Sequence, residues 1–343
     1  MKRLFPGAFF FCYFLFCVPT SAQLLFKANA ETGFNNSRGN SLNKGNNSLT
    51  RLETQLSYKY NQDNNSAIFQ IKARPEFYGL DGDLTSFKFR GSAEFSRREA
   101  SFNWGLSIFK HLNNISVSNT ANINHDIFFF QADLTLFILN DLPIKSNLGY
   151  AYQSVNSEGK QEFDLLFGGA KVHQVFSSYF RTGYGFYIEN FAIENKFTSD
   201  DQNTTESNKG YRFGPEVELY YLKDYIFNLR YRFLFHLSDQ TNFLSYEQWI
   251  RLVTGKILFP RFSVFILVDY YLRKFKESGS STGELPILYT PLNQENHISI
   301  KTGYDLTDKF EIYLKSSYSK EDLIYNNLSF EGWNFLLGIE FSN

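Results

Sequence analysis

The chain has 343 residues, a formal net charge of −1 and an aromatic content of 19%, with 39 Phe and 22 Tyr. Charged residues make up 20% of the chain, and both signs are spread along it, so no nucleic-acid partner is predicted. Beyond the N-terminal segment no apolar run approaches the ~20 residues of a spanning helix, which excludes a membrane protein built from helices.

The N-terminal segment, MKRLFPGAFFFCYFLFCVPTSAQ, predicts a signal peptide. Lys2 and Arg3 precede an apolar run, and the small residue Ala22 stands where a signal peptidase would cut. We therefore expect residues 1–22 to be the signal peptide and residues 23–343 to form one barrel domain. An uncleaved membrane anchor is the alternative, but the run is short for a spanning helix.

Both cysteines of the chain, Cys12 and Cys17, lie in this leader, so the mature protein has no thiol for a disulfide. Removing Lys2 and Arg3 moves the formal charge from −1 to −3. No cofactor or metal is predicted, because the histidines show no ligand spacing and no cysteine remains. The histidines are His111, His125, His173, His236 and His297.

The rest of the chain alternates apolar and polar residues, which is typical of strands with two different faces. In one such segment, Phe87 and Phe89 alternate with Lys88 and Arg90. We predict sixteen strands, with fourteen as the alternative count. The predicted strands cover 24–33, 49–60, 67–79, 85–97, 100–111, 126–139, 144–154, 161–172, 176–192, 210–221, 225–237, 245–257, 262–273, 296–306, 309–319 and 331–342.

The connections between these strands alternate in length. Those after odd-numbered strands are often long and polar, as in 35–48, 112–125, 197–209 and 274–294, whereas those after even-numbered strands are short. Long loops at one rim and short turns at the other are typical of outer-membrane barrels. Ten residues at ~3.3 Å each, tilted by ~45°, rise about 23 Å, which matches the ~25 Å apolar band of such barrels.

The predicted fold class is all-β: a transmembrane antiparallel β-barrel of about sixteen strands, closed by pairing of the first and last strands because lipid tolerates no open sheet edge. A secreted β-sandwich or solenoid is the alternative, but its core is usually rich in Val, Ile and Leu, whereas this chain is rich in Phe and Tyr.

The chain resembles bacterial outer-membrane β-barrel proteins, and in size and strand number it is similar to the porin-like ones. No specific family motif accompanies this resemblance. The ending Gly338-Ile-Glu-Phe341 is similar to the signal that the barrel-assembly machinery reads, although the chain ends on Ser342-Asn343. The resemblance implies export to the outer membrane of a Gram-negative bacterium.

A ring of sixteen strands is wide enough for a water-filled lumen, lined by the face opposite the apolar one. A basic wall facing an acidic one would orient dipolar solutes. The alternative is that these charges form ion pairs that hold the wall. The predicted lumen-lining residues are Arg51, Lys72, Arg74, Lys88, Arg90, Glu162, Asp164, Glu216, Glu218, Arg230 and Arg232. The predicted lipid-facing residues of the last strand are Trp333, Phe335, Leu337, Ile339 and Phe341.

We expect a passive channel for small hydrophilic solutes. The alternative is a non-conducting barrel that serves as a scaffold or as a component of surface assembly or export, and whether the loop 274–294 folds into the lumen or stands outside would distinguish the two. The predicted partners are outer-membrane lipid, the barrel-assembly machinery, and a second copy or a surface partner that contacts the long loops.

A lipid hydrolase is the remaining alternative, because His297 precedes Ser299 by two residues, and this spacing is similar to that of outer-membrane phospholipases. An enzyme that cuts membrane lipids needs this pair on the lipid side, whereas the alternation places it on the side of Lys301, toward the lumen. No catalytic residue is therefore predicted.

Overall fold

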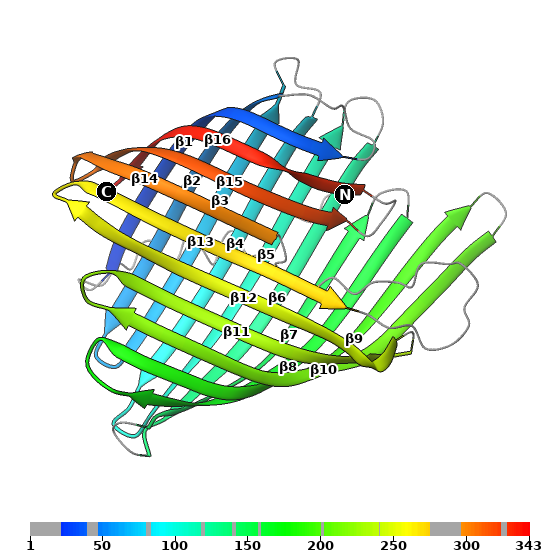
Figure 1. The fold of residues 1–343 in the computed structure, drawn as a ribbon, viewed down its shortest axis with the longest axis horizontal. Helices are drawn as coiled ribbons and strands as arrows, with labels where there is room; N and C mark the ends of the chain where they lie inside the picture. The colour runs from blue at the N-terminus through cyan, green and yellow to red at the C-terminus, as the bar shows by residue number, and fades with distance from the viewer. Residues whose placement is uncertain are drawn as a thin grey trace, which may run out of the picture.

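The computed structural model is a closed barrel of sixteen antiparallel strands (Figure 1). Each strand pairs with its neighbours in sequence, and β1 pairs with β16. The strands are β1 (Ala22–Gly39), β2 (Asn47–Gln62), β3 (Asn65–Tyr78), β4 (Leu84–Arg98), β5 (Phe102–Val117), β6 (Ala121–Leu136), β7 (Ile144–Asn156), β8 (Gly159–Val175), β9 (Phe180–Ser199), β10 (Gln202–Leu222), β11 (Ile226–Ser238), β12 (Thr241–Phe259), β13 (Phe262–Lys274), β14 (Asn296–Thr307), β15 (Phe310–Leu323) and β16 (Leu328–Ser342).

The structure describes the chain from residue 22 to its end, with several gaps between strands. The described ranges are 22–39, 47–79, 84–117, 121–138, 142–156, 159–199, 202–239, 241–274, 296–323 and 328–343. No helix within these ranges is long and apolar enough to cross a membrane. Residues 1–21 of the predicted signal peptide and nearly all of the loop 274–294 lie outside the described residues, whereas Ala22 already belongs to β1.

The sixteen strands and the pairing of the first strand with the last are confirmed. The connections predicted at 35–48, 112–125 and 197–209 are shorter than predicted, because the flanking strands continue into them. The polar segment 197–209, predicted as a loop, is paired strand except at its tip, since β9 and β10 pair out to Ser199 and Gln202. Both faces of this hairpin carry polar residues, so it lacks the apolar alternation that marks a strand in the sequence.

The two faces of the wall differ sharply in exposure. In β16, Trp333, Phe335 and Leu337 are 48%, 56% and 50% exposed, whereas the alternate residues Asn334 and Leu336 are 6% and 2% exposed. The other predicted lipid-facing residues, Ile339 and Phe341, share the parity of Trp333. Large apolar side chains on the exposed face form a band around the barrel, as a lipid environment requires, while the buried face points into the barrel.

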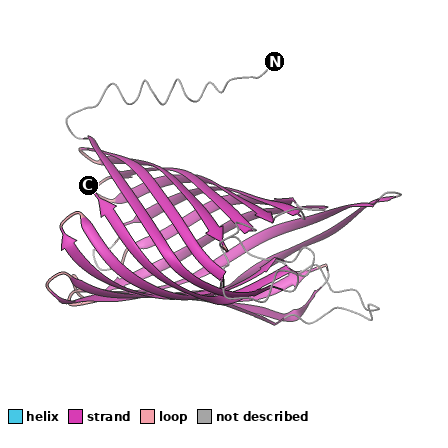
Figure 2. Ribbon diagram, turned by 90° about the horizontal axis from the view of Figure 1, so that it is seen from above, coloured by secondary structure: helices cyan, strands magenta, loops and turns pink. Residues whose placement is uncertain are grey.

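The two rims of the barrel also differ. We call the rim with the short turns the turn rim; it contains the turns at 63–64, 223–225, 260–261 and 308–309. The chain enters and leaves the barrel at this same rim, because Asn343 N lies 3.2 Å from Phe26 O. We call the opposite rim the loop rim. Figure 2 shows the strands crossing the wall at a tilt between the two rims.

The closing seam is held by a side chain that spans three strands. The hydroxyl of Tyr313 on β15 lies 2.7 Å from Asn29 Oδ1 and 2.8 Å from Glu31 Oε1 on β1. It passes over β16 at Gly338, where an added Cβ would stand 2.3 Å from Tyr313 Cζ. The glycine near the end of the chain therefore leaves room for the ring that ties the last hairpin to the first strand.

Candidate functional site: the inner face of the barrel

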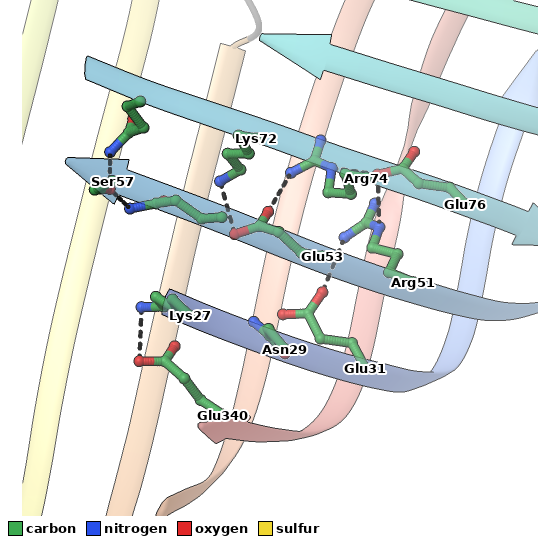
Figure 3. A network of polar contacts seen from close by, with 12 residues as sticks. Lys27, Asn29, Glu31, Arg51, Glu53, Ser57, Lys72, Arg74, Glu76 and Glu340 are labelled. Atoms are coloured by element: carbon green, nitrogen blue, oxygen red, sulfur yellow. Dashed lines mark hydrogen bonds and ion pairs between the residues drawn. The ribbon is translucent and has the colours of Figure 1, made fainter. Parts of the chain in front are cut away.

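Charged side chains of β1 to β4 form a continuous network on the inner face, which we call the ionic wall. Figure 3 shows the part of this network on β1 to β3. Its centre is Glu76, which is fully buried at 0% exposure. Its carboxylate lies 3.0 Å from Arg51 Nε, 2.9 Å from Arg74 Nε and 3.5 Å from Lys88 Nζ. The ionic wall consists of Glu31, Arg51, Glu53, Lys72, Arg74, Glu76 and Lys88.

From Glu76 on β3 the network extends through β2 to β1. Glu53 is 2.7 Å from Lys72 Nζ and 3.9 Å from Arg74 Nη1, while Glu31 is 3.8 Å from Arg51 Nη1. The register places Arg51 opposite Glu31 on β1 and opposite Glu76 on β3, so these charges pair directly across the sheet. Arg74 instead stands opposite Lys88, and both of these cations reach Glu76 from neighbouring positions. The predicted lumen-lining residues on β2 to β4 are thus joined mainly to carboxylates of the same wall.

A second group of charges lies on β8, β10 and β11. Antiparallel pairing places Glu216 opposite Arg232 and Glu218 opposite Arg230. Each glutamate forms an ion pair with its opposite arginine. Lys171 reaches both carboxylates, with Nζ 2.5 Å from Glu216 Oε1 and 2.9 Å from Glu218 Oε1. The predicted cluster of these four residues is present, and Lys171, which the sequence did not single out, joins its two halves.

A third group is buried beside it. Arg212, 2% exposed, pairs with Glu189 on β9 and Glu247 on β12. His236 Nδ1 lies 2.6 Å from Glu247 Oε1, and Ser245 is the register partner of His236. A serine, a histidine and a carboxylate are therefore neighbours, as in a hydrolase triad, but Ser245 and His236 are only 0% and 1% exposed. A substrate has no access to this hydroxyl, so the group serves to fix the wall.

On β5 to β9 the inner face carries a run of stacked aromatic rings beside charged residues such as Lys145, Lys171 and Glu189. Phe109 and Phe129 stack with ring centroids 4.7 Å apart, and Phe129 stacks on Phe167 at 5.4 Å. Tyr187 follows at 6.2 Å from Phe167. We call these four rings the aromatic wall. Phe167 lies over Gly149 on β7, where an added Cβ would be 2.3 Å from its Cζ, so this glycine permits the stack to cross β7.

An arginine stands at each end of the aromatic wall. The guanidinium of Arg90 is 4.4 Å from the centroid of Phe109, and that of Arg232 is 3.8 Å from the centroid of Tyr187. Arg232 also lies 4.7 Å from the ring of Trp249. A guanidinium is attracted to the negative face of an aromatic ring, so these contacts hold the stack at both ends. The predicted lumen residue Arg90 therefore belongs to the aromatic wall.

The predicted acidic pair Glu162 and Asp164 does not face the lumen, and that prediction is wrong. On β8 the inner-face residues are the alternate ones, including Phe163 and Leu165, which are 4% and 5% exposed. Glu162 Oε1 instead accepts a hydrogen bond of 2.7 Å from the hydroxyl of Tyr152, on the outer face. The hydroxyl of Tyr150 likewise donates to Asp164.

The physical reason is the position of the apolar outer band. On β8 the outer face is apolar at Leu166 and Val172, which are 53% and 43% exposed, while Glu162 and Asp164 follow toward the loop rim. Because residue parity fixes the face of the whole strand, these carboxylates share the face of Leu166 but lie beyond the band. The buried inner face opposite them is apolar. It contains Ala151, Phe163, Leu165, Phe191 and Ile193.

The lumen contains a cavity of about 410 Å³ between β6 and β13. Four of its lining residues, Glu216, Glu218, Arg230 and Arg232, are predicted lumen residues. The sequence did not single out its aromatic lining, because apolar parity was assigned to lipid throughout. Among the lining residues that were not predicted are Phe129, Lys145, Phe167, Arg212, Trp249 and Arg251.

The pair His297 and Ser299 lies on the inner face of β14, where Ser299 is 8% exposed. Within the described ranges no group of three or more His, Cys, Asp or Glu side chains could hold a metal ion.

No protein-family model matches the chain, and no curated protein matches it. Among solved structures, the Pseudomonas putida toluene transporter TodX is 10% identical, with 96% of this chain and 90% of that chain covered and a TM-score of 0.38. The siderophore receptor PiuA from Acinetobacter baumannii is 8% identical, with 93% and 82% covered and a TM-score of 0.46. CdiB from the same organism is 8% identical, with 95% and 60% covered and a TM-score of 0.49.

These likenesses extend to the barrel fold alone. The chain itself has a closed antiparallel barrel, an exposed apolar outer band and a polar inner face with a cavity. These properties define it as a β-barrel of the bacterial outer-membrane class.

Proposed function

We propose that the protein is a passive channel for small hydrophilic solutes across the outer membrane. The observation that carries the proposal is the cavity of about 410 Å³ inside the barrel, lined by ten charged side chains and enclosed by a wall with an apolar outer face. Charged groups in a lumen replace part of the hydration that a polar solute loses on entry. The barrel then separates this polar path from lipid.

Single-channel recording in planar lipid bilayers tests this proposal. We expect stepwise openings from the purified, folded barrel in potassium chloride. The control is the same preparation after heat unfolding, which should give no regular steps. Folded protein that inserts into the bilayer but never opens would contradict the proposal.

A pair of cysteine variants tests whether the current passes through the cavity. The natural cysteines, Cys12 and Cys17, lie within residues 1–21, which precede the first strand. Asn147 lines the cavity, whereas its neighbour Leu148 is 61% exposed on the outer face. An anionic methanethiosulfonate reagent should reduce the conductance of Asn147→Cys and leave that of Leu148→Cys unchanged. Equal effects on both variants would place the path elsewhere.

One observation favours a second candidate, a scaffold for surface assembly or export. At the loop rim, β9 and β10 pair as far as Ser199 and Gln202, whereas pairing of β10 with β11 begins only at Gly210 (Figure 1). The β10 side of the hairpin therefore extends past β11 and presents polar backbone to a partner, whereas β8 pairs with β9 as far as Phe197. Co-purification from native membranes, with and without residues 197–206, tests this. A partner lost with the hairpin while openings persist would support both activities.

We further propose that the barrel is not an enzyme. The position of Ser299 supports this, because it is almost buried on the inner face, whereas a lipid hydrolase needs its nucleophile toward lipid. Phospholipid hydrolysis by the purified barrel that disappears in Ser299→Ala would contradict the proposal.

A further inference from the structure

The cavity has an excess of basic side chains. Six basic and four acidic residues line it, a formal difference of +2. Most of the acids are already bound: Glu216 and Glu218 by Lys171 and two arginines, and Glu189 by Arg212. The fourth, Asp133, accepts a hydrogen bond of 2.7 Å from Gln131 Nε2. The acids of the cavity are therefore largely committed to contacts within the wall.

Two of the bases are not committed in this way. Within the described ranges, neither Lys145 on β7 nor Arg251 on β12 takes part in an ion pair. The nearest carboxylate in register with Arg251 belongs to Asp269, and that group accepts a hydrogen bond of 2.6 Å from the indole N–H of Trp249. The cavity thus offers an ammonium and a guanidinium with free donors to an incoming solute.

The same cavity has an apolar side. Phe129, Leu165, Phe167 and Leu234 line it together with the charged groups. Phe129 and Phe167 belong to the aromatic wall, which is held in place by stacking and by its terminal arginines. A rigid apolar surface next to free cations favours a solute that carries a negative charge on an apolar body. A fully hydrated ion would gain nothing from the apolar side.

We infer that this cavity binds small organic anions with an aromatic or similarly flat apolar part. Lys145 and Arg251 receive the carboxylate, and the aromatic wall contacts the ring. The volume of about 410 Å³ lies within the range of ligand pockets, roughly 300–1,000 Å³, and exceeds what one inorganic ion fills. The inference rests on the proposed channel function and names its solute class.

Three probes separate the contribution of the charge from that of the ring. Sodium benzoate carries both, sodium acetate carries only the charge, and benzyl alcohol carries only the ring. In planar bilayers, benzoate should reduce the single-channel conductance at about tenfold lower concentration than acetate or benzyl alcohol, since one charge-assisted contact is worth about that factor. Equal block by all three probes would overturn the inference while the channel stands.

A double variant tests the residues. Lys145→Gln with Arg251→Gln should weaken block by benzoate about tenfold and leave the response to benzyl alcohol unchanged. The matched control is Lys59→Gln, because Lys59 lies on the inner-face parity of β2 but does not line the cavity. If Lys59→Gln weakened block by benzoate to the same extent, the block would depend on the electrostatic potential of the whole lumen and not on a binding site.

A second measurement is independent of conduction. Trp249 lines the cavity, whereas Trp104 and Trp333 lie on the outer face. Benzoate should change the tryptophan fluorescence of the folded barrel in detergent, and Trp249→Phe should abolish this change. If the barrel shows no openings but this signal persists and requires Lys145 and Arg251, the site stands and the channel proposal fails. If benzoate changes neither conductance nor fluorescence, the site is refuted.

Discussion

The ionic wall and the aromatic wall are two solutions to the same packing problem on one inner face. On β2 to β4 most of the inner side chains are long and charged, and Glu76 forms ion pairs with three cations around it. On β5 to β9 four of the inner side chains are rings that stack from Phe109 to Tyr187. The first wall depends on charge balance and the second on volume, so single substitutions should damage them in different ways.

The largest effect is expected in the ionic wall. Glu76→Gln would leave Arg51, Arg74 and Lys88 without their common carboxylate. Removing one partner of a buried ion pair costs about 3–5 kcal/mol, because the remaining charges stay desolvated. We expect a loss of this size in the free energy of unfolding, measured by urea titration of the barrel in lipid vesicles.

The control for Glu76→Gln is Glu99→Gln at the turn rim. Glu99 is 2.6 Å from Arg97, but the two side chains are 30% and 50% exposed. Exposed pairs contribute roughly 0–1 kcal/mol, so this variant should unfold almost like the wild type. Equal losses in the two variants would mean that burial of Glu76 contributes nothing.

The aromatic wall should respond to loss of volume. Phe167→Ala removes the ring between Phe129 and Tyr187 and should cost about 3 kcal/mol, the usual range for a buried phenylalanine. Added salt should not change this loss, because no charge is removed. The adjacent Leu166→Ala, on the outer face at 53% exposure, is the control and should cost less. A larger cost at Leu166 would contradict the assignment of faces on β8.

The closing seam should show a smaller effect. Gly338→Ala places a methyl group 2.3 Å from Tyr313 Cζ, and overpacking of this kind costs about 1–3 kcal/mol. The control is Gly91→Ala, where an added Cβ has no neighbour within 4 Å.

A double variant identifies the source of the loss at the seam. In a Tyr313→Leu background the ring is absent, so Gly338→Ala should cost almost nothing when urea unfolding is compared with Tyr313→Leu alone. A loss that persists without the ring would show that the backbone, and not Tyr313, requires glycine.

The smallest change is expected outside the lumen. Glu162→Gln removes a carboxylate from the outer face and should cost less than about 1 kcal/mol. It should also leave the reversal potential in a potassium chloride gradient unchanged. Glu218→Gln, in the cavity, should shift the reversal potential toward anion selectivity because it removes one of the two carboxylates that Lys171 and Arg230 contact. A shift of the reversal potential in Glu162→Gln would show that this residue faces the lumen.

Sequence alternation was a sound guide where the inner face is charged. Arg51, Lys72, Arg74, Lys88 and the residues of the second group all have charged or polar character opposite an apolar face, and the structure places them on the inner side. The alternation failed on β8, where the outer face becomes acidic at Glu162 beyond the apolar band. Charged residues are expected to face the lumen only where the outer face lies within the apolar band. Alternation along a strand predicts the face of a residue but not its position along the barrel axis.

The network around Arg212 and the aromatic wall could not be read from the sequence for a related reason. Arg212 meets Glu189 and Glu247 only because three strands come into one register, and stacking of Phe129 on Phe167 also requires glycine at residue 149 of the strand between them. The sequence of one strand predicts whether each of its faces is apolar, polar or charged. The neighbours of its residues across the sheet depend on the relative shift of strands, which no local pattern encodes.

By itself, the sequence determined the strands, the closed ring and the apolar band, because these follow from residue alternation, loop lengths and the demand of lipid for satisfied backbone groups. Only the tertiary structure decided which side chains share the lumen. Strand register placed Lys145 and Arg251 beside the aromatic wall in one cavity, although 105 positions of the chain lie between them. The reason is that curvature and shear of a barrel bring distant residues together, while periodicity acts only within a strand.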